Sequence, residues 1–242
     1  MATATTAPSQ SSPAEARSRI VEALTRLAGK RRFEEISIRD ICAEADVSLA
    51  DFRDLFPSKG AVLAGLSRRL DREVLSAQPR ALEGETARDR LFDVLMRRLD
   101  AMAPYREGLR EVYSWLRRDL AAALEMNRVV VNSMRFMLEA AGVDAQGLAA
   151  PIKLQGLAFA WARVVAVWLD DEEPGLARTM AALDAELRRG EGAIANVERL
   201  ERVAEPIAAF ARAALNSRPR SRDFFRGRRH ERSEDDDPTA EI

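Results

Sequence analysis

Hydrophobic residues recur at helical spacing in almost every segment of this chain, and no segment shows the sustained alternation of a half-buried strand. Gly and Pro are sparse inside these segments, and no solenoid repeat is present. The pattern predicts an all-α fold and argues against a doubly wound sheet or a barrel. With 242 residues the chain is long enough to bury a sizeable core.

The composition excludes several kinds of site. The 38 basic and 39 acidic residues nearly cancel, so no global field draws the chain to nucleic acid or membrane. A single cysteine, Cys42, excludes intrachain disulfides and multi-cysteine metal sites, and a single histidine, His230, excludes His-pair sites. No carboxylate pair or nucleophile–base arrangement stands out, so we expect neither an enzyme nor a cofactor or metal.

The chain also lacks obvious targeting signals. No stretch reaches the ~18 uninterrupted apolar residues of a membrane span. Residues 1–13 have neither a charged nor an apolar region of the kind a secretory signal needs. We therefore expect a cytoplasmic protein without a stable membrane span, with a disordered segment at 1–13 and a disordered, charged tail at 217–242.

Two helical domains are expected between these ends, an N-terminal one at 14–76 and a larger one at 86–216. In the first, helices are predicted near Ala14–Ala28, from Ser37, from Ser48 to Phe56, and from Ser58. In the second, they are predicted near Thr86–Ala103, Arg106–Ala123, Asn127–Ala141, Ile152–Leu169, Leu176–Arg189 and Ala193–Asn216.

The residues from Ser37 to Phe56 form the most informative unit. Ser37 and Ser48 each begin a helix and are followed three residues later by Asp, which is the spacing of a capping box. Asp46 falls where the chain must turn tightly, and Asp tolerates the left-handed conformation better than most residues other than Gly. Two short helices with such a turn have the layout of a helix-turn-helix, whose second helix enters a major groove.

The run from Phe33 to Ser48, followed by Phe52 and by the Phe-Pro-Ser-Lys junction at 56–59, resembles the N-terminal domain of TetR-type regulators. The resemblance covers roughly Ala14 to Leu75. It implies an all-helical homodimer that binds a palindromic operator in double-stranded DNA with this domain. It also implies a small, apolar or lipid-like effector bound in the larger domain.

Carried over residue by residue, the resemblance assigns phosphate contacts to Arg39 and Lys59 and a helix cap to Ser48. Leu49, Ala50 and Asp51 stand where the family has Lys-Gly-Thr, and Arg53 and Asp54 replace an aromatic residue and a neutral polar residue. The implied DNA-binding residues are Ser37, Arg39, Ser48, Leu49, Ala50, Asp51, Arg53 and Lys59.

The charge of this segment argues in the opposite direction. From Ser37 to Phe56 there are two basic and five acidic residues, and phosphates dominate affinity for DNA. An acid can accept a hydrogen bond from cytosine N4, but acids next to phosphates are repelled. Neighbouring basic residues could offset the excess; they are Arg17, Arg19, Lys30, Arg31 and Arg32.

A second resemblance lies in the C-terminal half. The segments 154–158, 168–171 and 179–187, together with Trp161 and Val165, are similar to the ubiquinone-biosynthesis accessory family, whose members hold isoprenoid lipids in the equivalent cavity. This implies an alternative function, in which the chain is a lipid-binding accessory protein whose DNA-reading helix is degenerate.

Large apolar residues of the second domain are candidates for an effector pocket. The same residues could simply form the core, because Leu157, Trp161, Val165 and Trp168 follow one another at helical spacing. The acidic run Asp170–Glu173 is interpreted as a solvated loop rather than a metal site. The candidate pocket residues are Trp115, Met134, Met137, Trp161, Val165 and Trp168.

Overall fold

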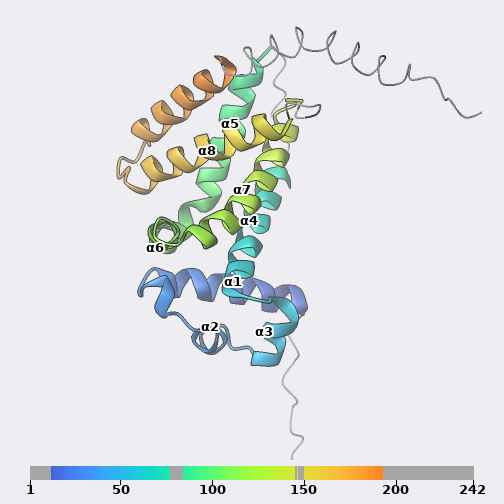
Figure 1. The fold of residues 1–242 in the computed structure, drawn as a ribbon, viewed down its shortest axis with the longest axis vertical. Helices are drawn as coiled ribbons and strands as arrows, with labels where there is room; N and C mark the ends of the chain where they lie inside the picture. The colour runs from blue at the N-terminus through green and yellow to red at the C-terminus, as the bar shows by residue number, and fades with distance from the viewer. Residues whose placement is uncertain (1–11, 77–83, 145, 147–149, 193–242) are drawn as a thin grey trace, which may run out of the picture. The chain divides into compact units, whose positions relative to one another are not determined.

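The computed structural model describes residues 12–76, 84–144, 146 and 150–192. These residues are helical apart from short connections and include no strand, which confirms the predicted all-α fold (Figure 1). The chain divides into two compact units, 1–197 and 198–242, and every described residue belongs to the first. The segment 1–11, the helix expected at Ala193–Asn216 and the tail at 217–242 lie outside the described residues.

The first helix begins earlier than predicted. Helix α1 spans Pro13–Ala28, and its N-cap is Ser12. The Ser12 hydroxyl accepts a hydrogen bond from Glu15 N at 3.2 Å, and the Glu15 carboxylate accepts one from Ser12 N at 2.9 Å. Ser12 and Pro13 were predicted to be disordered, but this capping box orders them. Pro13 fits at the first helical position, because a backbone N–H there would have no partner within the helix.

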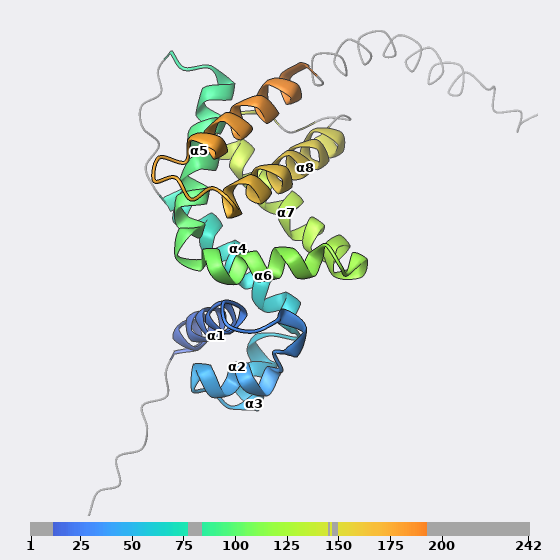
Figure 2. The same cartoon turned by 90° about the vertical axis from the view of Figure 1, so that its left-hand side faces the viewer.

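Three further helices follow in the N-terminal part. After a 3₁₀ turn, η1 at Phe33–Glu35, the chain forms α2 (Ile38–Ala45), α3 (Leu49–Leu55) and α4 (Lys59–Ser76). Helix α1 packs against α2, α3 and α4 and also against α6, which lies across it (Figure 2).

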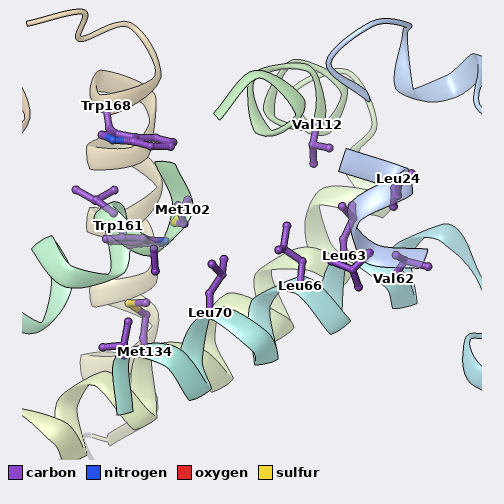
Figure 3. Close-up of a cluster of buried hydrophobic side chains, with 14 of the residues drawn as sticks. Leu24, Val62, Leu63, Leu66, Leu70, Met102, Val112, Met134, Trp161 and Trp168 are labelled. Atoms are coloured by element: carbon purple, nitrogen blue, oxygen red, sulfur yellow. The ribbon is translucent and has the colours of Figure 1, made fainter. Parts of the chain in front are cut away.

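Helix α4 joins the N-terminal helices to the rest of the chain. Its stripe of Val62, Leu63, Leu66, Leu70 and Val74 is buried along the whole helix. Figure 3 shows Val62 and Leu63 close to Leu24 of α1, whereas Leu70 lies toward Met134 of α7. The described residues of both predicted domains therefore share one continuous core.

The second part contains α5 (Ala87–Met102), the 3₁₀ turn η2 (Ala103–Tyr105), α6 (Arg106–Leu116), α7 (Leu120–Ala140), α8 (Ala150–Leu169) and helical residues 177–192. The predicted break between Ala123 and Asn127 is wrong, since α6 ends at Leu116 and α7 begins at Leu120. The Asp119 carboxylate accepts a hydrogen bond from Ala122 N at 2.9 Å and so caps α7.

Helix α8 is the one described helix long and apolar enough, by length and composition alone, to cross a membrane. No such span was predicted from the sequence. Leu154, Trp161, Val164 and Trp168 of this helix are nevertheless buried among the other helices, which is the arrangement of a core helix.

A buried ion pair lies in the core between α4, α5 and α7. The Arg98 guanidinium donates to Asp71 Oδ1 and, at 3.2 Å, to Ser67 Oγ. Ser133 Oγ donates to the same Asp71 oxygen at 2.6 Å. Arg98 is 4% exposed, and its guanidinium carbon lies 5.6 Å from the Trp161 ring centroid. Burial lowers the pKa of Arg98, and the Asp71 carboxylate opposes this shift.

Candidate nucleic-acid interface

Two capping boxes fix the ends of α2 and α3. Ser37 Oγ accepts from Asp40 N at 3.1 Å, and Ser48 Oγ accepts from Asp51 N at 3.0 Å. Each aspartate in turn accepts from the backbone N–H of its serine, at 2.8 Å for Asp40 and 3.3 Å for Asp51. Both hydroxyls also donate to these carboxylates, so the two serines position the helices.

The turn between α2 and α3 has the predicted left-handed residue. Asp46 adopts φ 50° and ψ 56° at the C-terminus of α2. Val47 N donates to Cys42 O at 3.1 Å, which closes the end of the helix. The chain then reaches Ser48 and turns into α3. The helix-turn-helix predicted from Ser37 to Phe56 is therefore present.

The inner faces of both helices are buried, which fixes the outer face of α3. Ile41, Cys42 and Phe52 pack into the core with Ile20 of α1, and burial raises the pKa of the Cys42 thiol. Phe56 ends α3 in an extended conformation with φ −142°, because Pro57 disfavours helical geometry at the residue before it.

The residues predicted to meet DNA fall into two groups. Leu49, Ala50, Arg39 and Arg53 are exposed, and the two arginines form no hydrogen bond or ion pair with other described residues. Ser37, Ser48 and Asp51 are exposed too, but their side chains are engaged in the caps. Asp54 is exposed on the same turn of α3 as Arg53.

Lys59 is placed differently from what the resemblance implies. Its Nζ donates to Phe33 O at 2.9 Å and to Ile36 O at 2.7 Å, and it lies 4.8 Å from the Phe33 ring centroid. Burial lowers the pKa of Lys59, while Glu34 and Asp40 oppose the shift. Two of its three N–H groups thus hold the segment before α2 in place.

Neighbouring arginines reduce the acidic excess of the helix-turn-helix. Arg26 Nε lies 3.0 Å from a Glu44 oxygen, and Arg31 lies 3.4 Å from an Asp40 oxygen. The hydrogen bond from Ser37 N, followed by the one from its hydroxyl, lowers the pKa of Asp40, which stays ionised. Once both arginines are counted, the excess of three acids falls to one.

Helix α6 connects this region to the end of α8. A Cβ on Gly108 would clash with the Thr25 carbonyl oxygen of α1, so only Gly permits this close approach. Glu111 accepts from Phe33 N at 3.1 Å. At the other side of α6, Arg106 donates to the carbonyls of Trp168 and Asp171, and Arg110 Nη2 donates to Leu169 O at 2.6 Å.

The predicted pocket residues pack chiefly as core. Met134, Met137, Trp161 and Trp168 are almost fully buried, and Val165 packs against them in part. Trp115 instead packs on Phe33 at 4.3 Å between ring centroids, next to the segment that leads into α2. The alternative of a core face describes their placement best, and their role in binding an effector stays a prediction.

Asp171 corrects the interpretation of the acidic run 170–173. It is fully buried, and its Oδ2 accepts from Thr179 N at 2.9 Å and from Thr179 Oγ1 at 2.7 Å. These bonds lower the pKa of Asp171. One of the four acids therefore holds the loop before the last described helix in place. The prediction of a solvated loop is wrong for this residue.

Solved structures with the same fold include two TetR transcriptional regulators. One, from Nitrosomonas europaea, gives a TM-score of 0.57 at 22% identity and covers 72% of this chain and 97% of its own. Another, from Rhodococcus sp. RHA1, gives 0.53 at 17% identity and covers 74% and 97%. This chain has the TetR-regulator fold. No family model matches the sequence, and no curated protein is significantly similar to it.

Both of these structures bear the name of a transcriptional regulator, and neither is a quinone-biosynthesis accessory protein. The resemblance of the C-terminal half to the accessory family gains no support from them and stays a prediction.

Proposed function

We propose that this chain is a DNA-binding transcriptional regulator of the TetR type that binds a palindromic operator as a homodimer. The observation that carries the proposal is the outer surface of α2 and α3. There Arg39 and Arg53 face solvent without partners among the described residues, on a helix-turn-helix whose inner face is buried. A guanidinium without a protein partner is available to a phosphate or a guanine.

In the proposed complex each subunit places α3 in a major groove. Arg39 and Arg53 bond phosphates, while Leu49, Ala50 and Asp51 face base edges. The two half-sites then lie about one helical turn apart, roughly 34–36 Å along the duplex. Lys59 contributes mainly by holding the segment between η1 and α2.

Self-association is supported by apolar side chains on the outside of α8. Ile152 is 63% exposed and Phe159 is 56% exposed, although both belong to a helix whose opposite face lies in the core. A two-fold arrangement that covers this face would bury them. Phe159→Glu is expected to shift the protein toward monomer in sedimentation velocity.

The proposed effector is a small apolar or lipid-like molecule that binds among the large side chains around Trp161 and Trp168. It would act by preferring one arrangement of α6, because α6 contacts both the end of α8 and η1, the turn that precedes the helix-turn-helix. We expect the protein to work in the cytoplasm and not as an enzyme.

The test is selection of duplexes from a random-sequence DNA library by the purified full chain, followed by fluorescence anisotropy on the enriched sequence. We expect a two-fold symmetric site, and Arg53→Ala should weaken binding to it by about tenfold. Arg135→Ala, which removes an exposed arginine from α7, is the matched control and should bind as the wild type does.

Failure to enrich any duplex, by protein that is folded and dimeric, would overturn the proposal. If native mass spectrometry of the same protein also detects a co-purified isoprenoid, the lipid-binding accessory function takes its place.

A further inference from the structure

The outer surface of α3 carries an apolar hollow, to which the proposed phosphate contacts of Arg39 and Arg53 assign no role. Its volume is about 430 Å³. Leu49, the first residue of α3, is 53% exposed at this hollow, and the rings of Phe52 and Phe56 are buried behind it. The lining residues are Ile38, Leu49, Ala50, Phe52, Arg53, Phe56 and Pro57.

Helical spacing places an apolar residue and a cation together at this hollow. Leu49 and Arg53 are four residues apart and therefore lie on the same face of α3. Ala50 is small, so the backbone there can approach a partner closely. A partner that fits this face must offer an apolar group within reach of Leu49 and negative charge or acceptor atoms within reach of Arg53.

The major groove of DNA offers this combination. Its base edges present donors and acceptors, except for the C5-methyl group of thymine, which is apolar. We infer that Leu49 and Ala50 receive thymine methyl groups, so that each operator half-site has thymine at the positions facing the start of α3. The inference rests on the proposed function and specifies which feature of the base pairs the helix reads.

The charges around the hollow favour DNA over the other apolar occupants, which are an effector and a second copy of the chain. Arg53 lines the hollow and Arg39 is exposed at the start of α2, and neither has a partner among the described residues. An apolar molecule would leave both guanidinium groups without a counter-charge. A duplex supplies phosphates for them and a methyl group for the hollow.

The experiment replaces thymine by uracil in the selected duplex, one symmetric pair of positions at a time, which removes the methyl group and nothing else. Binding is measured by fluorescence anisotropy with the full chain. At one or two positions per half-site we expect about a fourfold loss of affinity for each methyl removed, from the burial of a single methyl group. Uracil at the other positions should have no effect.

Leu49→Ala provides the second arm. At the position that faces residue 49, this variant should bind the thymine and uracil duplexes nearly equally, while keeping the salt dependence of the wild type. Leu124→Ala, which truncates a leucine on α7 that is 60% exposed, is the matched control and should keep the full preference for thymine.

The outcomes separate the two proposals. If the wild type binds a symmetric site and every uracil duplex binds equally well, the inference is overturned and the proposed function stands. If Leu49→Ala keeps the full thymine preference, the inference is likewise overturned. If no duplex is selected at all, both fail together.

Discussion

Arginine has opposite surroundings in two regions of the molecule, the surface of α2 and α3 and the interior between α4, α5 and α7. On the surface, Arg39 and Arg53 lie in solvent and have no partner among the described residues. In the interior, Arg98 is 4% exposed, and Asp71 and Ser67 accept from it. A buried charge must find its partners within the protein, whereas an exposed charge is free for another molecule. Changes to the interior should therefore affect stability, and changes to the surface should affect binding.

The largest effect is expected from Arg98→Ala. It leaves the Asp71 carboxylate buried without its cation, which costs about 3–5 kcal/mol of unfolding free energy. Urea denaturation followed by circular dichroism measures it. The neighbouring variant Arg97→Ala removes a surface pair with Asp93 and should cost less than about 1 kcal/mol. Equal losses in the two variants would contradict the contrast between interior and surface.

Gly108→Ala tests the junction between the two regions. The added methyl group meets the Thr25 carbonyl and must push α6 away from α1, at a cost of roughly 1–3 kcal/mol. At Gly60, a Cβ would make only ordinary contacts of 3.7 Å. Gly60→Ala should therefore leave the melting temperature unchanged or raise it. A Gly108→Ala variant as stable as wild type would show that α1 and α6 are not in close contact.

Ser48→Ala should have an intermediate effect, confined to the start of α3. Loss of the cap leaves Asp51 N without its acceptor and costs about 1 kcal/mol. Hydrogen exchange should increase at the first N–H groups of α3 and not in α7. Unchanged exchange at these N–H groups would mean that the cap does not fix this helix.

The smallest stability effect concerns acid. Hydrogen bonds from Thr179 lower the pKa of Asp171 in the folded protein. The stabilisation is present above the unfolded pKa and is lost as the pH falls through the folded pKa. Thermal melts below about pH 5 should show a smaller acid-induced decrease in Asp171→Asn than in wild type. If the melting temperatures of wild type and Asp171→Asn fell equally with pH, the Asp171 carboxylate would not be a source of the acid sensitivity.

The local parts of the fold could be predicted because their signals are local. The capping boxes at Ser37 and Ser48, the left-handed Asp46 and the stop at Pro57 involve residues within a few positions of one another. The same kind of signal was present at Ser12, three residues before Glu15, but Ser12 was assigned to a disordered end. At Asp119 it was missed, because apolar residues continue at helical spacing across the break.

The remaining features depend on contacts between distant segments. Lys59 bonds to carbonyls 23 and 26 residues away, and no local pattern shows that its ammonium is directed there. Asp71 follows Leu70 on α4, where an acid looks solvated until Arg98 and Ser133 are placed against it. The resemblance placed Leu49 and Arg53 among the DNA-binding residues, but the hollow that both line became apparent only once Ile38 and Pro57 were located in space.

The salt dependence of DNA binding tests the central claim most directly. Affinity of wild type and Arg53→Ala for the selected duplex is measured by anisotropy over a range of salt concentrations. If Arg53 contacts one phosphate in each subunit, the slope of log K against log salt should become shallower by about 2 in the variant, at unchanged stability. Equal slopes and affinities for the two proteins would contradict the assignment of this surface to DNA.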